Sequence, residues 1–332
     1  MTGRKRVLLT GIILLSLLAC RFSTGDGSQS AAWREEKLQV GEDLRWFRVY
    51  EPRDLQNPAP VVVLLHGGTQ SMRKIFEENS GGTQAWLDVA DQEGVLLLVP
   101  NGTNRENGDT KGDHQNWNDL RPASSGDEVE LDDVAFVNAL LNWAEQSYAL
   151  DASRIYVTGA SNGGMMTYRL LIELPERFAA GAAFISSLPD DLSLVSRPDA
   201  PTPLMIVNGT EDSLVKWEGG NVGGRGNGKT LPVEESLAWW LAANRAIPGQ
   251  AVSTTLPDLD PDDHCRLHVT QYPALDGGAP VRFIKMDGGG HALPSMDYEI
   301  PDIVVVDLLI GPVCQDAEGA WLAWEFLQEF TR

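Results

Sequence analysis

A serine lies at the centre of a glycine-flanked pentapeptide, residues 159–163, in which Ser161 takes the third position of the pattern G-x-S-x-G. An apolar stretch typical of a strand precedes it at residues 154–158, and a helical pattern follows at residues 165–174. In that context the glycines relieve crowding at a sharp strand-to-helix turn, which presents the serine hydroxyl as a nucleophile. The alternative is an ordinary glycine-rich turn. The flanking strand and helix favour the nucleophile.

A serine hydroxyl is a weak nucleophile until a base accepts its proton. Of the five histidines, His291 combines a position late in the chain with a glycine-rich loop that follows an apolar strand at residues 281–285. The other four are His66, which ends a core strand, His114, which lies in a long polar loop, and His264 and His268, which flank Cys265. We therefore expect His291 to be the base.

The imidazole of such a base needs a carboxylate that fixes its tautomer, and in this chain order the acid lies between the serine and the histidine. Glu211 and Asp212 follow an expected strand at residues 203–207. Both carboxylates could instead solvate a turn. Their position after a strand favours a catalytic role.

Acyl transfer also requires backbone N–H groups that stabilise the negative charge on the reacting oxygen. We expect one such donor at Asn162, directly after the nucleophile, and the other at Gly68 or Thr69, in a loop that begins with His66. A turn that simply ends the strand at residues 60–65 is compatible with this oxyanion hole.

Strands and helices alternate along the chain. Strands are expected at residues 44–50, 60–65, 95–99, 154–158, 179–185, 203–207 and 281–285, and helices at residues 84–92, 132–148, 165–174 and 319–330. This alternation predicts an α/β protein with a mainly parallel sheet and helices on both faces. The polar stretch at residues 103–130 is too long for an ordinary connector, so we expect it to lie over the site.

Taken together, the motifs resemble the esterases that include polyhydroxybutyrate depolymerases and bacterial feruloyl esterases. The shared motifs are at residues 65–70, 117–119, 132–134, 159–166, 208–212 and 289–291. The resemblance implies the α/β-hydrolase fold and a triad of Ser161, Asp212 and His291, with Asp212 preferred over Glu211. It implies carboxylic ester hydrolysis, and the two-step mechanism needs neither a cofactor nor a metal.

Substrate expectations are less direct. Trp117 could line an acyl pocket, since an aromatic wall suits a flat or apolar acyl group, or it could anchor a packed loop. Relatives that attack solid polymer often carry an added binding domain, and none follows the last expected helix. We therefore expect short-chain or feruloyl-type esters, free or oligomeric, with polyhydroxyalkanoate depolymerase, a serine peptidase of the same fold and a non-catalytic binding lipoprotein as alternatives.

Other acidic residues receive structural roles. Asp132 and Asp133 are expected at the start of a helix, where the helix dipole favours negative charge. The acidic run at residues 258–263 could hold calcium, although a solvated loop is the preferred interpretation.

Composition restricts the partners of the chain. The 332 residues are 42% hydrophobic and 22% charged, with a formal net charge of -21. A phosphate backbone is bound by clustered lysine and arginine, so this acidic field argues against nucleic acid. This length and hydrophobic content are enough to bury the core of one large catalytic domain, which we place at residues 37–332.

The first residues are typical of an export signal. A basic start is followed by an apolar run at residues 7–18, and residues 17–20 resemble the lipobox of bacterial lipoproteins, in which Cys20 is acylated. A plain secretory signal with an incidental cysteine is the alternative. We expect a lipoprotein-type signal peptide at residues 1–20 and a flexible tether at residues 21–36, so that a lipid anchor would be the protein's only membrane contact.

Three cysteines occur in the chain. If Cys20 carries lipid, Cys265 and Cys314 remain as the only possible disulfide in an oxidising compartment. Two buried free thiols are the alternative.

Overall fold

The computed structural model describes residues 32–77, 80–122, 129–224, 227–298 and 310–332. The signal peptide and Cys20 expected from the sequence lie outside these residues. In the described residues the main elements are β1 (Ala32–Val40), β2 (Asp43–Glu51), β3 (Ala59–Leu65), α1 (Ala85–Glu93), β4 (Leu96–Pro100), α2 (Asp133–Ser147), β5 (Leu150–Ala160), α3 (Asn162–Glu173), β6 (Ala180–Phe184), β7 (Leu204–Gly209), β8 (Gly220–Asn221), β9 (Lys229–Thr230), α4 (Val233–Ala243), β10 (Val252–Thr255), β11 (Arg266–Tyr272), β12 (Val281–Asp287) and α6 (Gly319–Leu327).

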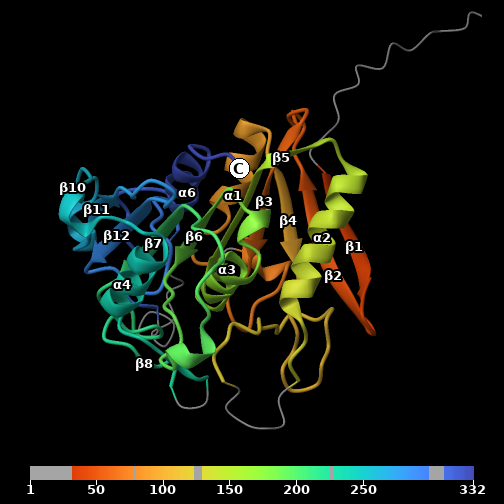
Figure 1. Cartoon of the computed structure of the whole chain (residues 1–332), viewed down its shortest axis with the longest axis horizontal. Helices are drawn as coiled ribbons and strands as arrows, with labels where there is room; N and C mark the ends of the chain where they lie inside the picture. Colours follow the sequence, from red (N-terminus) through yellow and green to blue (C-terminus); the bar gives the residue numbers. More distant parts are fainter. Residues whose placement is uncertain (1–31, 78–79, 123–128, 225–226, 299–309) are drawn as a thin grey trace, which may run out of the picture.

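A twisted sheet with the strand order β1-β2-β4-β3-β5-β6-β7-β12-β11-β10 crosses the molecule (Figure 1). The strands from β4 to β12 in this order pair in parallel, whereas β1, β2, β11 and β10 extend the two edges through antiparallel pairs. The central strands β3 and β4 are buried along their whole length, as expected for apolar strands covered on both sides.

Helices cover both faces of this sheet (Figure 1). Side chains of α2, α3 and α4 belong to one hydrophobic cluster, and those of α1 and α6 belong to the cluster on the other face. The strand order and the two helical layers confirm the α/β-hydrolase fold expected from the sequence.

The beginning of the folded body was predicted wrongly. β1 starts at Ala32 and pairs antiparallel with β2 along its whole length, so residues 32–36 belong to the sheet and not to a tether. The sequence signal was weak because β1 is an edge strand with mostly exposed, charged side chains and lacks the apolar run of the central strands.

None of the helices in the described ranges is long and apolar enough to cross a membrane.

Candidate active site

Ser161 occupies the sharp turn between β5 and α3, as the glycine pattern predicts. Its backbone has a φ of +56°, a left-handed conformation that is strained for a residue with a side chain. A Cβ added at Gly159 would lie 2.6 Å from the Gly163 carbonyl carbon, and one added at Gly163 would lie 2.4 Å from Leu65 O. Gly159 is therefore required for β5 to approach α3, and Gly163 is required for α3 to approach the end of β3.

Asp212 and His291 meet at the carboxyl ends of neighbouring parallel strands, β7 and β12. The imidazole Nδ1 of His291 lies 2.7 Å from Asp212 Oδ2. The other carboxylate oxygen accepts hydrogen bonds of 2.8 Å from the backbone N–H groups of Leu214 and Val215. With a proton on Nδ1 donated to Asp212, the Nε2 atom of a neutral His291 is available as a base. The structure thus pairs His291 with Asp212 and leaves Glu211 exposed.

A disulfide supports the loop that carries His291. Cys265 and Cys314 are bonded, with their Cα atoms 5.3 Å apart, which confirms the expected pairing over two free thiols. A Cβ added at Gly289 would lie 2.9 Å from Cys314 Sγ and 3.3 Å from Cys265 Sγ, so the loop packs directly on the bridge. The Gly290 N–H donates to Pro312 O at 2.7 Å, which also joins the His291 loop to the segment that contains Cys314.

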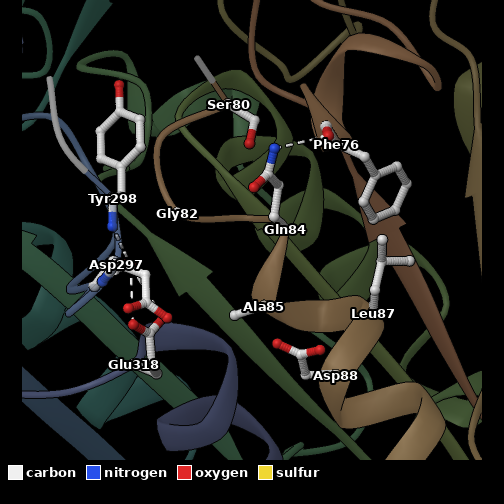
Figure 2. Close-up of a pocket in the computed structure, with 11 residues that line it drawn as sticks. Phe76, Ser80, Gly82, Gln84, Ala85, Leu87, Asp88, Asp297, Tyr298 and Glu318 are labelled. Carbon is white, nitrogen blue, oxygen red and sulfur yellow. Dashed lines mark hydrogen bonds between the residues drawn. The ribbon is translucent and has the colours of Figure 1, made fainter. Parts of the chain in front are cut away.

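Ser161 and His291 open onto one cavity of about 440 Å³. Its walls include the glycines of the expected oxyanion loop and apolar side chains, among them Ile185, Leu214 and Leu293. A second cavity of about 630 Å³ adjoins it and contains the three carboxylates of Asp88, Asp297 and Glu318 (Figure 2). Ser80 lines both cavities.

The three residues expected to form the oxyanion hole all line the catalytic cavity. A Cβ at Gly68 would lie 3.1 Å from Asn116 Oδ1 and 3.5 Å from the Cβ of Asn162, so this glycine allows the two loops to come together. The Thr69 N–H donates to Asn116 Oδ1 at 3.3 Å. Gly68 and Asn162 therefore remain the better pair of donors.

Trp117 does not line the cavity. Its side chain is completely buried, and its indole N–H donates to His66 O at 2.8 Å. The acyl-pocket role suggested by the sequence is therefore corrected to the packed loop anchor. An indole that bridges the loop to the end of β3 satisfies its polar N–H inside the core, where no room is left for a ligand.

The side chain of Asn162 holds the loop that contains Trp117. Its Oδ1 accepts from the Trp117 N–H at 2.7 Å, while its Nδ2 donates to Trp117 O at 3.1 Å and to Asp119 Oδ2 at 2.6 Å. Asp119 also forms a buried ion pair with Arg121. Burial alone would raise the pKa of Asp119, but the Arg121 guanidinium reverses this and lowers it below its ordinary value.

Sequence reasoning assigned no role to Asp119 or Arg121. The motif at residues 117–119, which belongs to the resemblance, was the only sequence signal for Asp119. Spacing alone does not connect this motif to Asn162, because Asp119 and Asn162 are more than forty positions apart. Arg121 and Arg105 both line the catalytic cavity.

His66 has a structural role. Gly102 donates its N–H to His66 Nε2 at 3.0 Å, and His66 Nδ1 lies 2.8 Å from Gly67 O, which fixes a neutral ring with its proton on Nδ1. Complete burial lowers the pKa of His66 to about 4. This ring cannot exchange protons with a substrate at Ser161.

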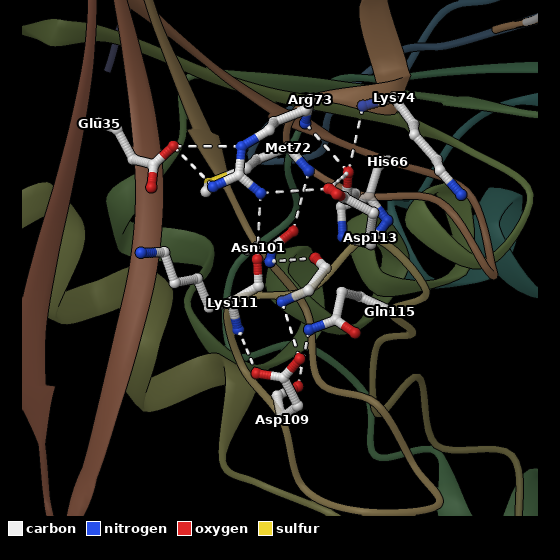
Figure 3. Close-up of polar contacts among 12 residues, drawn as sticks. Glu35, His66, Met72, Arg73, Lys74, Asn101, Asp109, Lys111, Asp113 and Gln115 are labelled. Carbon is white, nitrogen blue, oxygen red and sulfur yellow. Dashed lines mark hydrogen bonds and ion pairs between the residues drawn. The ribbon is translucent and has the colours of Figure 1, made fainter.

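The polar stretch expected over the site is held in place by polar contacts with neighbouring segments (Figure 3). Asn101 Oδ1 accepts from the Met72 N–H at 2.9 Å, and its Nδ2 donates to Thr110 O and Gly112 O. Arg73 joins Glu35 of β1 to Asp113 of this stretch through ion pairs. Three of its described residues, Arg105, Asn116 and Arg121, line the catalytic cavity, which confirms its expected position.

The acidic residues at the start of α2 and in the run at residues 258–263 form contacts within the protein. Asp132 accepts from the Ala135 N–H and caps α2, as expected, and Asp133 forms a buried ion pair with Arg45 of β2. In the acidic run, the Asp263 carboxylate accepts from the Cys265 and Gln315 N–H groups. Among the described residues no group of three or more histidine, cysteine, aspartate or glutamate side chains could hold a metal ion.

Comparison with known proteins finds esterases. The chain is 24% identical over 283 residues to a bifunctional acetylxylan esterase/xylanase of Neocallimastix patriciarum, covering 84% of this chain and 35% of that protein. It is 34% identical over 142 residues to feruloyl esterase B of Neurospora crassa, covering 41% of each chain. A poly(3-hydroxybutyrate) depolymerase of Ralstonia pickettii is 30% identical over 166 residues, which cover 49% of this chain and 33% of that protein. The resemblance drawn from the motifs is thereby confirmed.

These matches span about a third to two fifths of the length of the three curated relatives. The model of the prolyl oligopeptidase family matches residues 107–188, which contain the Ser161 turn. Among solved structures, an acetyl xylan esterase from Aspergillus awamori superimposes with a TM-score of 0.52 at 16% identity, covering 79% of this chain and 95% of that one. A thermostable esterase gives a TM-score of 0.50 at 18% identity, covering 90% of this chain and 63% of that one. At these identities the structural likeness shows the fold.

Proposed function

We propose that this chain is an exported serine esterase that hydrolyses carboxylic esters through an acyl-enzyme. The observation that carries the proposal is the bond of 2.7 Å between His291 Nδ1 and Asp212 Oδ2, in a pair whose histidine shares a cavity with Ser161. A carboxylate that orients a neutral imidazole, with a strained serine on the same cavity wall, is the arrangement that acyl transfer requires.

In the first step His291 Nε2 takes the proton of the Ser161 hydroxyl while Oγ attacks the ester carbonyl carbon. The oxygen of the tetrahedral intermediate receives hydrogen bonds from the backbone N–H groups of Gly68 and Asn162. The C–O bond to the alcohol then breaks, and the alcohol leaves with the proton from His291. In the second step His291 takes a proton from water while the water oxygen attacks the acyl carbon. The bond from the acyl carbon to Ser161 Oγ then breaks, the carboxylic acid leaves, and Oγ recovers its proton from His291.

The catalytic cavity favours short-chain or feruloyl-type acyl groups. Its volume of about 440 Å³ suits a small acid, and the apolar side chains of Ile185, Leu214 and Leu293 give it an apolar wall. The sequence similarity to feruloyl and acetylxylan esterases supports the same substrates.

The substrate test compares p-nitrophenyl acetate, methyl ferulate and a polyhydroxybutyrate suspension at equal enzyme concentration, with Ser161→Ala as the blank. We expect turnover of the soluble esters. Rapid clearing of the suspension with negligible turnover of both soluble esters would instead make the chain a depolymerase.

A serine peptidase is the second candidate, because the match to the prolyl oligopeptidase family includes Ser161. Amide hydrolysis needs the same triad, so geometry does not separate the two. Peptide p-nitroanilides measured beside p-nitrophenyl acetate do separate them, and turnover of the anilides alone would favour the peptidase.

We further propose export with lipidation of Cys20, on the basic and apolar pattern of residues 4–20. Lipid mass on the N-terminal peptide of the protein expressed in a bacterium, lost in Cys20→Ser, is the expected result. Retention of residues 1–19 in the mature protein would contradict it.

A further inference from the structure

The two expected oxyanion donors belong to different segments of the chain. Gly68 lies in the loop after β3, and Asn162 is the first residue of α3. Both N–H groups must point at one oxygen, at distances of about 2.7–3.1 Å, so an error in their relative position weakens the stabilisation of the tetrahedral intermediate. Contacts that hold the two segments in register therefore affect catalysis directly.

The side chain of Asn162 is held by a loop at residues 116–119, here called the Trp117 loop. This side chain is buried, and its three hydrogen bonds reach Trp117 and Asp119. The Trp117 N–H can only donate and an ionised Asp119 carboxylate can only accept, so the oxygen and the nitrogen of the amide each have one allowed place. The bond to Asp119, at 2.6 Å, is strengthened by the charge of the carboxylate. These contacts fix the residue that supplies one oxyanion donor.

The Trp117 loop also contacts the segment that contains Gly68. Asn116 Oδ1 accepts from the Thr69 N–H at 3.3 Å, and a Cβ added at Gly68 would lie 3.1 Å from the same oxygen. The indole N–H of Trp117 donates to His66 O at 2.8 Å. One loop therefore binds both segments that supply the oxyanion donors.

Given the proposed esterase function, on which this inference rests, we propose that Asn162 and Asn116 are positioning residues for acyl transfer. Through the Trp117 loop their side chains set the spacing of the Gly68 and Asn162 N–H groups. The ester carbonyl oxygen gains its negative charge only as the tetrahedral intermediate forms. Correct spacing of the donors therefore matters more for the transition state than for substrate binding.

A role in folding alone is the alternative, because hydrogen bonds to a buried amide also stabilise the protein. The two roles have different kinetic effects. A misplaced donor lowers kcat and weakens the binding of a tetrahedral adduct by the same factor, with KM almost unchanged. A loss of stability alone reduces the amount of active enzyme, which lowers the apparent kcat but leaves both KM and the inhibition constant of the adduct as they were.

The test uses full-length Asn162→Ala and Asn116→Ala, each of which removes one contact of the Trp117 loop. Asn118→Ala is the matched control, because its side chain belongs to the same loop but donates to Glu130 and does not line the catalytic cavity. For each protein, kcat and KM for p-nitrophenyl acetate are measured with the inhibition constant of phenylboronic acid, which forms a tetrahedral adduct with an activated serine.

We expect Asn162→Ala and Asn116→Ala each to lower kcat about tenfold, which is less than the loss of a whole oxyanion donor. The inhibition constant of phenylboronic acid should rise by the same factor, while KM stays within about twofold. Asn118→Ala should change none of the three. The double variant Asn162→Ala/Asn116→Ala should lose less than the product of the two single losses, because both side chains act on the same pair of donors.

A kcat within about twofold of the unchanged protein in both folded single variants would overturn the proposal. A lower kcat with an unchanged inhibition constant, a higher KM alone, or an equal loss in Asn118→Ala would also overturn it, and so would a double variant whose losses multiply. If Asn162→Ala does not fold, the half-buried Asn116 decides the matter through its own variant. Failure of the esterase proposal gives a different result, because the unchanged protein would then not hydrolyse p-nitrophenyl acetate.

Discussion

At the residue scale, the Asp212 carboxylate receives three hydrogen bonds, from His291 and from the backbone N–H groups of Leu214 and Val215. An asparagine in its place would have an NH2 group where one of the two carboxylate oxygens now lies. That group would face either His291 or the two backbone N–H donors. Both arrangements disturb the imidazole tautomer. We therefore expect Asp212→Asn to lower kcat about a thousandfold or more, as measured with p-nitrophenyl acetate.

Glu211→Gln is the matched control, since its exposed side chain lies one position away. Its kcat should stay within about twofold of the unchanged protein, because substitutions at exposed positions away from a site have small effects. A larger loss in Glu211→Gln than in Asp212→Asn would move the orienting role to Glu211.

His66 makes the stability of the fold depend on pH. Its pKa in the folded protein is about 4, below the ordinary value of 6.5, so the unfolded chain gains a proton first as the pH falls. The folded protein therefore loses stability between about pH 6.5 and pH 4, by about 2 kcal/mol at pH 5 from this ring alone. Above pH 6.5 the ring is neutral in both the folded and the unfolded chain, so it does not change the free energy of unfolding with pH.

Urea unfolding at pH 7.5 and pH 5 measures this contribution. His66→Gln keeps one acceptor and one donor but does not titrate, so its loss of unfolding free energy between the two pH values should be smaller than that of the unchanged protein by about 2 kcal/mol. Equal losses in both proteins would exclude His66 as the source.

At the element scale, α2 is joined to β2 through Arg45 and Asp133, whose side chains are 1% and 2% exposed. Asp133 also accepts from the Asn118 N–H at 2.8 Å, in the loop beside the catalytic cavity. Removing one partner leaves a buried charge without compensation. We expect Asp133→Ala to lower the free energy of unfolding by about 3–5 kcal/mol.

The double variant Arg45→Met/Asp133→Ala should be more stable than Asp133→Ala, since it removes the buried charge as well. Glu173→Ala breaks the more exposed pair with Arg169 and serves as the control, with an expected cost of about 1 kcal/mol or less. Equal costs for Asp133→Ala and Glu173→Ala in urea unfolding would show that burial of the first pair is unimportant.

The sequence predicts elements well where one physical signal dominates. Apolar runs gave the buried strands β3 and β4, and the Asp132 cap marked the start of α2. The polar edge strands β1 and β10, and β11 between β10 and β12, were missed because their side chains carry no apolar run: β1 and β10 are largely exposed, and β11 is mostly half-buried. The antiparallel hairpin of β11 and β12 depends on pairing partners that local pattern does not specify.

The candidate active site likewise combines residues that local sequence patterns predict with residues that they do not. Ser161 and His291 follow from local motifs at strand ends, whereas the contacts of Asn162 with Trp117 and Asp119 are distant in sequence. Trp117 was ambiguous because a large aromatic side chain suits both a ligand wall and a core, and only the fold decides which space it fills.

At the scale of the whole molecule, the disulfide joins positions 49 residues apart and lies beneath the loop that carries His291. In the chain-entropy model a closed loop of this length contributes roughly 4 kcal/mol. We expect Cys265→Ser/Cys314→Ser to lower the unfolding free energy by about this amount and to reduce kcat, because Gly289 loses its rigid support. Thermal unfolding and p-nitrophenyl acetate turnover measure the two effects.

The same double variant tests the link between the bridge and the site. Reduction of the unchanged protein by dithiothreitol should reproduce both losses, while the reductant should leave the double variant unaltered. An unchanged midpoint of unfolding after verified reduction would contradict a stabilising bridge.

The proposed esterase depends on Ser161 as a nucleophile that His291 activates, with the whole fold holding the two residues on one cavity. Labelling by a fluorophosphonate probe, followed by mass spectrometry of the modified peptide, tests it most directly, because the probe reacts with an activated serine. We expect one label on Ser161 in the unchanged protein, no label in Ser161→Ala, and strongly reduced labelling in His291→Ala, with all three proteins folded by circular dichroism. A folded, unchanged protein that takes up no label, or a Ser161→Ala variant that is labelled equally well, would contradict it.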